Sequence, residues 1–257
     1  MHGLGDQLGE IRAIAQFAST FAGANDVLLC VPSTLISRAV ATSGGGVAIG
    51  GEDCAADRVG PYTGDISAEM LKDAGASAVI VGHSERRRRH QETNPMVAAK
   101  AAAAGRAGLA AIICIGETQA ERDSGAALAV RSAQLETSLP TDRRLCQGSA
   151  IAYEPLWAIG TGQTPDARAI AEVHQHIRQR LKALMGNDEP TIRILYGGSL
   201  TPANAKAILA LPDVGGVLVG GASLRSQDFN PIIRAAAAVK QAPSETDLAA
   251  PALDAAQ

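Results

Sequence analysis

The sequence predicts an α/β barrel of the (β/α)8 type that lacks its first strand. Seven short apolar segments recur along the 257 residues, helix-like stretches separate them, and an amphipathic helix precedes the first of them. Segments that are apolar nearly throughout and alternate with helices are typical of parallel strands covered on both faces. A doubly wound open sheet could also hold seven such strands, so this pattern alone leaves both architectures open.

The predicted elements follow one another in a regular order. The first is a helix whose apolar face is formed by Leu4, Leu8, Ile11, Ile14, Phe17 and Phe21. The seven predicted strands, rich in Val and Ile, are 27–31, 47–50, 78–82, 110–115, 150–153, 192–196 and 216–219. The stretches between them carry helical periodicity. From Asp166 to Leu184, apolar residues recur every three or four positions, at Ile170, Val173, Ile177, Leu181 and Leu184.

Composition excludes several classes of protein. Hydrophobic residues make up 46% of the chain, which is enough for a large core. No apolar run approaches the roughly 18–20 residues that a membrane span needs. The formal net charge of −3 gives no reason to expect nucleic acid or an anionic membrane as a partner. We expect residues 1–240 to form one domain and the Ala- and Pro-rich residues 241–257 to form a disordered tail.

The cysteines and the first residues bear on the compartment. Cysteines occur at four widely scattered positions without metal-ligand spacing: Cys30, Cys54, Cys114 and Cys146. Reduced core thiols in a cytosolic protein explain them better than a disulfide does. Residues 1–4 have neither the basic nor the apolar region of a signal peptide. We therefore expect a cytoplasmic protein.

Polar residues at the carboxyl ends of the predicted strands are the candidates for chemistry, because active sites of closed parallel barrels lie at that end. His83 follows the strand at 78–82, and Glu154 follows the strand at 150–153. Either residue by itself could simply cap a helix or bind a neighbouring backbone group. Together, a carboxylate and an imidazole facing one mouth would suit proton transfer next to a carbonyl group.

Two glycine clusters follow the last two predicted strands, Gly197-Gly198-Ser199 and Gly220-Gly221. Glycine lets backbone N–H groups approach an anion closely, and a following helix N-terminus adds partial positive charge. Either cluster alone could be only a tight turn. Since the phosphate site of such barrels is frequently built by the loops after strands 7 and 8, the two clusters together predict phosphate binding.

The segment 155–162 directly follows Glu154. It contains Trp157, the only tryptophan of the chain, together with one proline and two glycines. A plain strand–helix connection would rarely expose Trp, Leu and Ile together. The composition is that expected of a closing lid with defined hinge ends.

With these motifs, the chain resembles the triosephosphate isomerase family. The matching segments are 81–87, 152–155, 157–162, 196–199 and 219–222, in the family's order and spacing over residues 2–240. The resemblance implies a TIM barrel and the interconversion of dihydroxyacetone phosphate and glyceraldehyde 3-phosphate through an enediol(ate), a step of glycolysis and gluconeogenesis. It implies no metal or organic cofactor. It also implies a homodimer formed through the loop around Tyr62, Thr63 and Gly64.

The resemblance further assigns roles to individual residues. Glu154 would be the base that moves a proton between C1 and C2, and His83 would be a neutral electrophile on the carbonyl oxygens. The phosphate would be held by Gly160, Ser199, Gly220 and Gly221. The catalytic pair would be supported by Ser84, Glu85 and Cys114.

The chain departs from the family pattern at one place. Family members carry a strand ending in Asn-x-Lys just before the residues that Met1-His2-Gly3 matches, and Lys72 lies too far along the chain to replace that lysine. We therefore expect a truncated chain with impaired turnover, since loss of one preorganised donor costs about 10²–10³ in rate. The alternative is a catalytically impaired homologue that serves as a phosphate-ligand or protein-binding module. Retention of His83 and Glu154 argues against that alternative.

Overall fold

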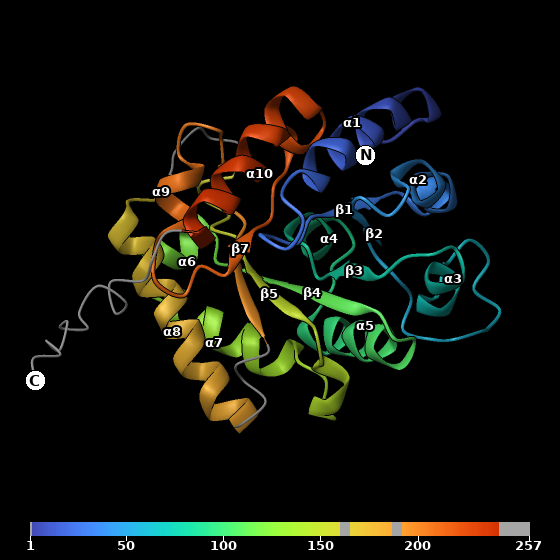
Figure 1. The fold of residues 1–257 in the computed structure, drawn as a ribbon. Helices are drawn as coiled ribbons and strands as arrows, with labels where there is room; N and C mark the ends of the chain where they lie inside the picture. Colours follow the sequence, from blue (N-terminus) through green and yellow to red (C-terminus); the bar gives the residue numbers. More distant parts are fainter. Residues whose placement is uncertain (1, 160–164, 187–191, 242–257) are drawn as a thin grey trace, which may run out of the picture.

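The computed structural model describes residues 2–159, 165–186 and 192–241. Seven parallel strands form one curled sheet in sequence order, and helices cover its outer face (Figure 1). The strands are β1 (Leu28–Val31), β2 (Ala48–Gly51), β3 (Ala78–Val81), β4 (Ala110–Ile115), β5 (Ala150–Tyr153), β6 (Arg193–Tyr196) and β7 (Gly216–Val217). All seven lie where the sequence predicts a strand, and six of them agree within one residue at each end. The strand predicted at 216–219 ends earlier, at Val217.

The helices fill the connections between strands. The α-helices are α1 (Leu8–Ser19), α2 (Ile36–Ser43), α3 (Ala68–Asp73), α4 (Ser84–Arg89), α5 (Asn94–Arg106), α6 (Gln119–Asp123), α7 (Ala127–Ser138), α8 (Ala167–Met185), α9 (Ala205–Leu209) and α10 (Ser226–Gln241). Short 3-10 helices lie at η1 (Gly5–Gln7), η2 (Ser33–Leu35), η3 (Arg143–Cys146) and η5 (Gly221–Ser223). None of the helices in the described ranges is long and apolar enough to cross a membrane.

Two expectations about the helices need correction. Leu4 precedes η1 and is 72% exposed, so it does not belong to the packed face of the first helix, where Ile11 and Ile14 are buried. Gln241 lies at the end of α10, whereas the sequence analysis placed it at the start of the tail. Residues 242–257, the rest of that predicted tail, lie outside the described residues.

The sheet has a core on each face, because successive residues of a strand point to opposite sides. The larger core joins outward-facing strand residues such as Ile113 and Ile151 to the helices. The smaller inner core consists of Ile112, Cys114 and Ala152, with half-buried Leu28, Cys30, Ile80, Leu195 and Leu218 packed against it. The inner core is therefore best buried at β4 and β5.

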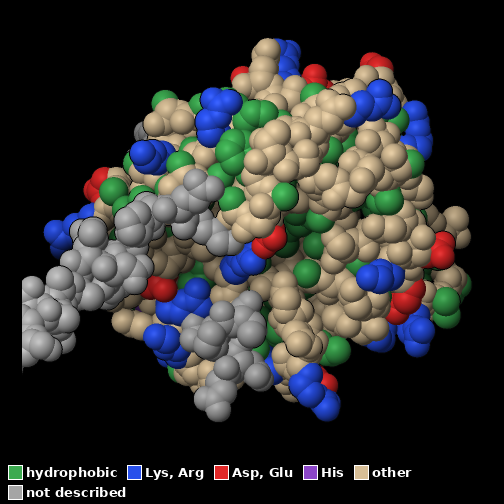
Figure 2. All heavy atoms as spheres, in the orientation of Figure 1, with side chains coloured by type: hydrophobic (Ala, Val, Ile, Leu, Met, Phe, Trp, Pro, Cys, Tyr) green, Lys and Arg blue, Asp and Glu red, His purple; other side chains and the backbone are tan. Residues whose placement is uncertain are grey.

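The two edges of the sheet are β1 and β7. Above them, α1 packs against α10, so the first and last described helices lie side by side (Figure 1). The Glu10 side chain accepts a hydrogen bond of 2.6 Å from the Ser226 N–H at the start of α10. Charged side chains of both signs are scattered over the face of the molecule seen in Figure 2.

Candidate active site

His83 and Glu154 meet at the carboxyl ends of β3 and β5. The His83 Nε2 and Glu154 Oε1 atoms lie 3.0 Å apart, although 70 residues separate the two along the chain. β4 pairs with both β3 and β5 in parallel register, so the residues that follow β3 and β5 emerge at the same end of the sheet. Glu154 is 2% exposed and the His83 side chain is one-third exposed, so the pair combines a buried carboxylate with an imidazole open to the mouth.

Glu154 is held by backbone and side-chain donors. The Ser84 N–H donates to Oε2 and the Ser84 hydroxyl donates to Oε1, each at 3.0 Å. Gly116 and Gly197 allow the chain around the base to pack closely, because a Cβ at Gly116 would lie 1.8 Å from the Glu154 carbonyl oxygen and one at Gly197 would lie 3.1 Å from its Cγ. Gly197, which the sequence suggested for a phosphate loop, thus also sets the space beside the base.

The contact of His83 with Glu154 favours a charged ring, whereas its contact with the Glu85 N–H favours a neutral ring. Burial lowers the pKa of His83, but the hydrogen bond and negative charge of Glu154 outweigh burial, so that pKa is raised. Nδ1 of the ring accepts a 3.3 Å hydrogen bond from the Glu85 N–H in the first turn of α4. An accepting Nδ1 carries no proton, so this contact favours a neutral ring with its proton on Nε2.

The other residues predicted to support the pair are placed differently from one another. Glu85 touches His83 only through its backbone N–H, and its side chain is exposed. Cys114 lies in the inner core, where burial raises the pKa of its thiol and the charge of Glu154 raises it further. The thiol therefore stays protonated beside the carboxylate.

Sequence reasoning missed Arg87, which donates to the Gly82 and Cys114 carbonyls and so connects the ends of β3 and β4.

The predicted phosphate residues lie after β6 and β7. The Ser199 hydroxyl donates 2.9 Å to the Ala158 carbonyl, which joins the loop after β6 to the segment that follows Glu154. Gly220 and Gly221 are exposed, and a Cβ at either position would meet nothing within 4 Å in the described parts of the chain. Within the described residues, the space beside their backbone is therefore open. Gly160, the fourth predicted phosphate residue, lies outside the described residues.

Glu117 is a buried carboxylate that sequence reasoning also missed. It follows β4, is 0% exposed, and accepts hydrogen bonds from Tyr153 and Trp157, on either side of Glu154 in sequence. A signal was available in the sequence, because Glu117 lies two residues after the predicted strand 110–115, close to the positions that His83 and Glu154 take after theirs.

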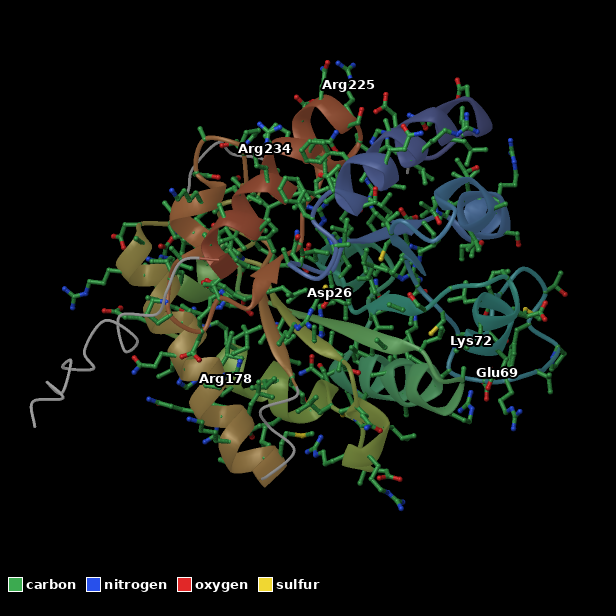
Figure 3. The ribbon with its side chains drawn as sticks, in the orientation of Figure 1. Asp26, Glu69, Lys72, Arg178, Arg225 and Arg234 are labelled. Carbon is green, nitrogen blue, oxygen red and sulfur yellow. The ribbon has the colours of Figure 1, made fainter. Side chains whose placement is uncertain are left out.

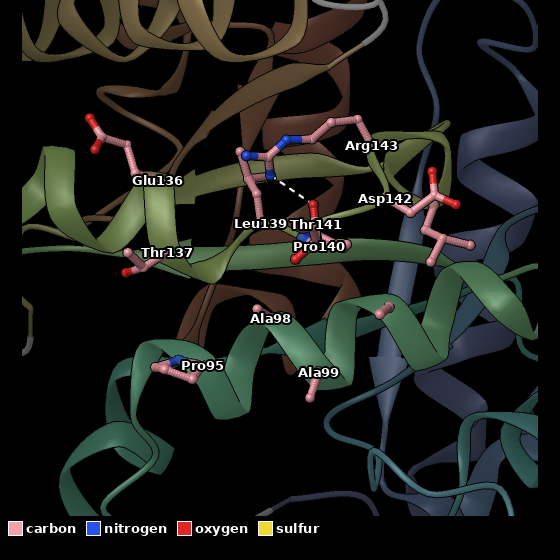
Figure 4. Close-up of a pocket in the computed structure, with 12 residues that line it drawn as sticks. Pro95, Ala98, Ala99, Glu136, Thr137, Leu139, Pro140, Thr141, Asp142 and Arg143 are labelled. Carbon is pink, nitrogen blue, oxygen red and sulfur yellow. Dashed lines mark hydrogen bonds between the residues drawn. The ribbon is translucent and has the colours of Figure 1, made fainter.

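A surface cavity of about 570 Å³ lies away from these residues, between α5 and the segment 136–145 (Figure 4). Pro95, Ala98 and Ala99 line one side of the cavity. On the other side, the Arg143 guanidinium donates a hydrogen bond to the Pro140 carbonyl. None of the predicted site residues lines it. Within the described ranges, no three His, Cys, Asp or Glu side chains gather as they would around a metal ion.

Comparisons with known proteins agree with this arrangement. A family model described as triosephosphate isomerase matches residues 4–236. A triosephosphate isomerase of Rhodopseudomonas palustris (strain BisA53) is 52% identical over 232 residues, covering 89% of this chain and 91% of that protein. One of Afipia carboxidovorans is 54% identical over 236 residues, covering 91% and 94%.

A solved structure gives the same answer for the fold. The crystal structure of triosephosphate isomerase from Bartonella henselae matches with a TM-score of 0.84 and 47% sequence identity, covering 91% of this chain and 94% of that chain. The expected barrel is therefore confirmed over the doubly wound sheet. The chain belongs to the triosephosphate isomerase family and is an isomerase with the TIM barrel fold.

Proposed function

We propose that this chain interconverts dihydroxyacetone phosphate and glyceraldehyde 3-phosphate, with Glu154 as the base and His83 as the electrophile. The observation that carries the proposal is the 3.0 Å contact between a buried carboxylate and an imidazole at one end of a parallel sheet. In this reaction the Glu154 carboxylate takes a proton from C1 of the ketose, and the protonated carboxyl returns it to C2 of the enediol(ate), while the hydroxyl proton passes from O1 to O2 by way of His83. No group is transferred to another molecule, so the two side chains and the substrate suffice.

His83 would polarise the carbonyl oxygen while the proton moves. Its Nε2–H, directed at Glu154 in the structure, would donate to the substrate oxygen instead once the substrate lies between the two side chains. The contact that raises the pKa of His83 would then be lost, whereas the Glu85 N–H would still donate to Nδ1. A neutral imidazole donor during turnover follows from that exchange.

The phosphate group would lie over the loops after β6 and β7. Ser199, Gly220 and Gly221 offer backbone N–H groups there, and the open space beside both glycines supports this position. Gly160 is proposed for the same group from the family motif alone. Ser84 would orient Glu154 through its two hydrogen bonds.

We also propose a homodimer that assembles through the loop around Tyr62, Thr63 and Gly64. Two apolar side chains of this loop, Val59 and Tyr62, are 85% and 50% exposed, which is unfavourable in water unless a partner covers them. Sedimentation of the chain beside Tyr62→Asp tests this point: the variant should sediment as the smaller species. A cytoplasmic location and a single domain followed by a tail remain proposals from the sequence.

Replacement of the base tests the reaction. Glu154→Asp shortens the side chain by one methylene and should lower kcat by about 10²–10⁴, the usual contribution of a general base, in a coupled isomerase assay. Binding of inorganic phosphate, measured by calorimetry, should change little because the phosphate loops are untouched. An unchanged turnover number for this variant would show that another group is the base.

The reduced turnover expected from the missing Asn-x-Lys motif stays a prediction. Neither of the two lysines on α3 and α5 substitutes for that motif: Lys72 extends from α3 at the periphery (Figure 3) and donates to the Gly108 carbonyl, and Lys100 pairs with Asp53 and Glu92. The assay should compare this chain with one lengthened upstream of Met1 by about a dozen residues, which is enough for a strand of typical length. Equal kcat values would contradict the prediction, and phosphate binding without turnover in both would favour the binding-module alternative.

A further inference from the structure

A buried arginine occupies a core position of α7. The helix turns Arg131, Leu135 and Ser138 inward, at the spacing of one helical face, and all three are buried. An apolar residue is expected at such a position, and a guanidinium there is strongly unfavourable unless an anion compensates it. The position of Arg131 therefore points to a partner.

That partner is Glu117. The Arg131 Nη1 atom lies 3.0 Å from Glu117 Oε1, and the two side chains are 9% and 0% exposed. The same oxygen accepts hydrogen bonds of 3.0 Å from the Tyr153 hydroxyl and from the Trp157 indole N–H. Burial and the charge of Glu117 raise the pKa of Tyr153, so its hydroxyl keeps the proton that it donates.

Glu117 holds the chain on both sides of the catalytic base. Tyr153 directly precedes Glu154, and Trp157 follows it by three residues. The backbone takes part as well, because the Leu156 N–H donates 3.1 Å to the Glu117 carbonyl. Any shift of Glu117 would therefore move both ends of the short segment that carries the base.

We propose that Arg131 is a positioning residue for the isomerisation: its charge fixes the Glu117 carboxylate, and Glu117 in turn fixes the segment Tyr153–Trp157 and the Glu154 carboxylate beside His83. This inference rests on the proposed role of Glu154 as the base. Among the described residues, the ion pair of Arg131 is with Glu117 and not with Glu154 or His83, so we place its action through Glu117. A small displacement of a reacting group can cost a large factor in rate, so indirect support of this kind is felt in kcat.

The contacts of Arg131 favour this role over simple packing. Its Nε and Nη1 atoms have no hydrogen-bond partner within the described residues, and Nη1 makes an ion pair with Glu117 Oε1. An aliphatic side chain would fill the same space without the cost of burying a charge. Hydrogen bonds to an ionised carboxylate are also stronger than those to a neutral acceptor, which strengthens the contact to Trp157.

The decisive experiment replaces the charge in the full chain. Arg131→Met keeps an unbranched apolar stem and removes the guanidinium, whereas Arg131→Lys keeps a positive charge. The matched control is Arg180→Met, because Arg180 of α8 pairs with Glu136 of α7 and leaves Glu117 untouched. Since Trp157 is the only tryptophan, its fluorescence reports on this segment without reference to activity.

For Arg131→Met we expect red-shifted emission, stronger quenching by acrylamide and a kcat lowered by about tenfold with little change in KM, because positioning and not binding is lost. Arg131→Lys should restore most of both signals, and Arg180→Met should resemble the unaltered chain. A folded Arg131→Met with normal fluorescence and normal kcat would overturn the proposal.

A second variant covers the case in which Arg131→Met does not fold. The double variant Arg131→Met/Glu117→Gln removes both charges and keeps a neutral acceptor for Trp157. It should therefore fold, with a kcat between those of the unaltered chain and of Arg131→Met. Normal kcat and fluorescence in the double variant would also overturn the proposal. Failure of the proposed function would look different, because the unaltered chain itself would then lack turnover.

Discussion

The sheet has a complete side and an incomplete side. From β3 to β5, each strand pairs with two neighbours, and the inner residues Ile112, Cys114 and Ala152 are buried. At β1 and β7, each strand pairs with one neighbour among the described strands, and the inner residue Leu28 is only half-buried. Both candidate catalytic side chains follow strands of the complete side. The two exposed glycines proposed for phosphate binding, Gly220 and Gly221, follow β7, at the incomplete side.

The difference agrees with the two tasks proposed for the site. Proton transfer requires side chains held to a fraction of an ångström, and the paired strands β3, β4 and β5 supply that rigidity. The proposed phosphate binding by backbone N–H groups requires open space beside glycine, and within the described residues Gly220 and Gly221 after β7 have that space. Changes on the complete side should therefore have larger effects than matched changes on the incomplete side.

The largest expected effect is on catalysis. His83→Gln removes the imidazole at the end of β3 and keeps a side-chain donor, so kcat should fall by about 10²–10⁴. The melting temperature should stay nearly constant because His83 is partly exposed. A coupled assay with parallel thermal unfolding measures both, and a variant that kept its turnover number would remove His83 from the mechanism.

The next largest effect is on the core of the complete side. Ile112→Ala removes a buried side chain from β4, and the resulting cavity should lower the free energy of unfolding by about 2–5 kcal/mol. Urea unfolding measures the loss. A value below that range would mean that the inner core at β4 is no better packed than the core at the edges.

Acid should weaken the incomplete side through His174. This residue of α8 is 0% exposed and donates from Nδ1 to the Asp213 carbonyl just before β7, and burial lowers its pKa to about 4. The folded chain thus keeps His174 neutral, whereas the unfolded chain protonates it near its ordinary pKa of 6.5. Stability is complete above pH 6.5 and falls as the pH drops toward 4, by at most about 3 kcal/mol.

His174→Asn tests that cause, because it keeps a donor for the Asp213 carbonyl and cannot titrate. Urea midpoints at pH 7 and pH 5 should differ less in this variant than in the unaltered chain. Equal differences in both would assign the acid sensitivity to other groups.

The smallest effect is expected at the edge strand. Leu28→Ala changes the same inner core as Ile112→Ala, but from half-buried β1, so it should cost roughly 1 kcal/mol. Urea unfolding of Leu28→Ala and Ile112→Ala, measured side by side, gives the difference in lost unfolding free energy between β1 and β4. Equal losses at Leu28 and Ile112 would contradict the division into two sides.

Much of this contrast could be predicted from the sequence. Continuous apolar segments bounded by glycine and proline placed every strand, and polar residues just after two of them, His83 and Glu154, indicated the catalytic pair. β7 ends at Val217 although Leu218 and Val219 are apolar, and the Leu218 N–H still donates to the Tyr196 carbonyl of β6. Apolar character alone does not reveal where a strand stops pairing.

The contacts of Arg131 and Glu117 could not be predicted in the same way. Their contact joins α7 to the end of β4, and it depends on side-chain orientations that a linear pattern does not contain. The useful signal was a charged residue on the inward face of a helix, which conflicts with ordinary amphipathic patterning. Such conflicts are expected at functional positions, where local rules give way to the requirements of the site.

The hydrogen bond from the Ser226 N–H to Glu10 links the first and last described helices, so we expect them to open together. Because α1 contributes the acceptor and α10 the donor, and the two helices pack together, we expect fraying of either helix to loosen the other. Amide exchange should accordingly report these two helices as one cooperative opening unit. A protease that cuts within α1 would then act, in effect, on the far terminus as well.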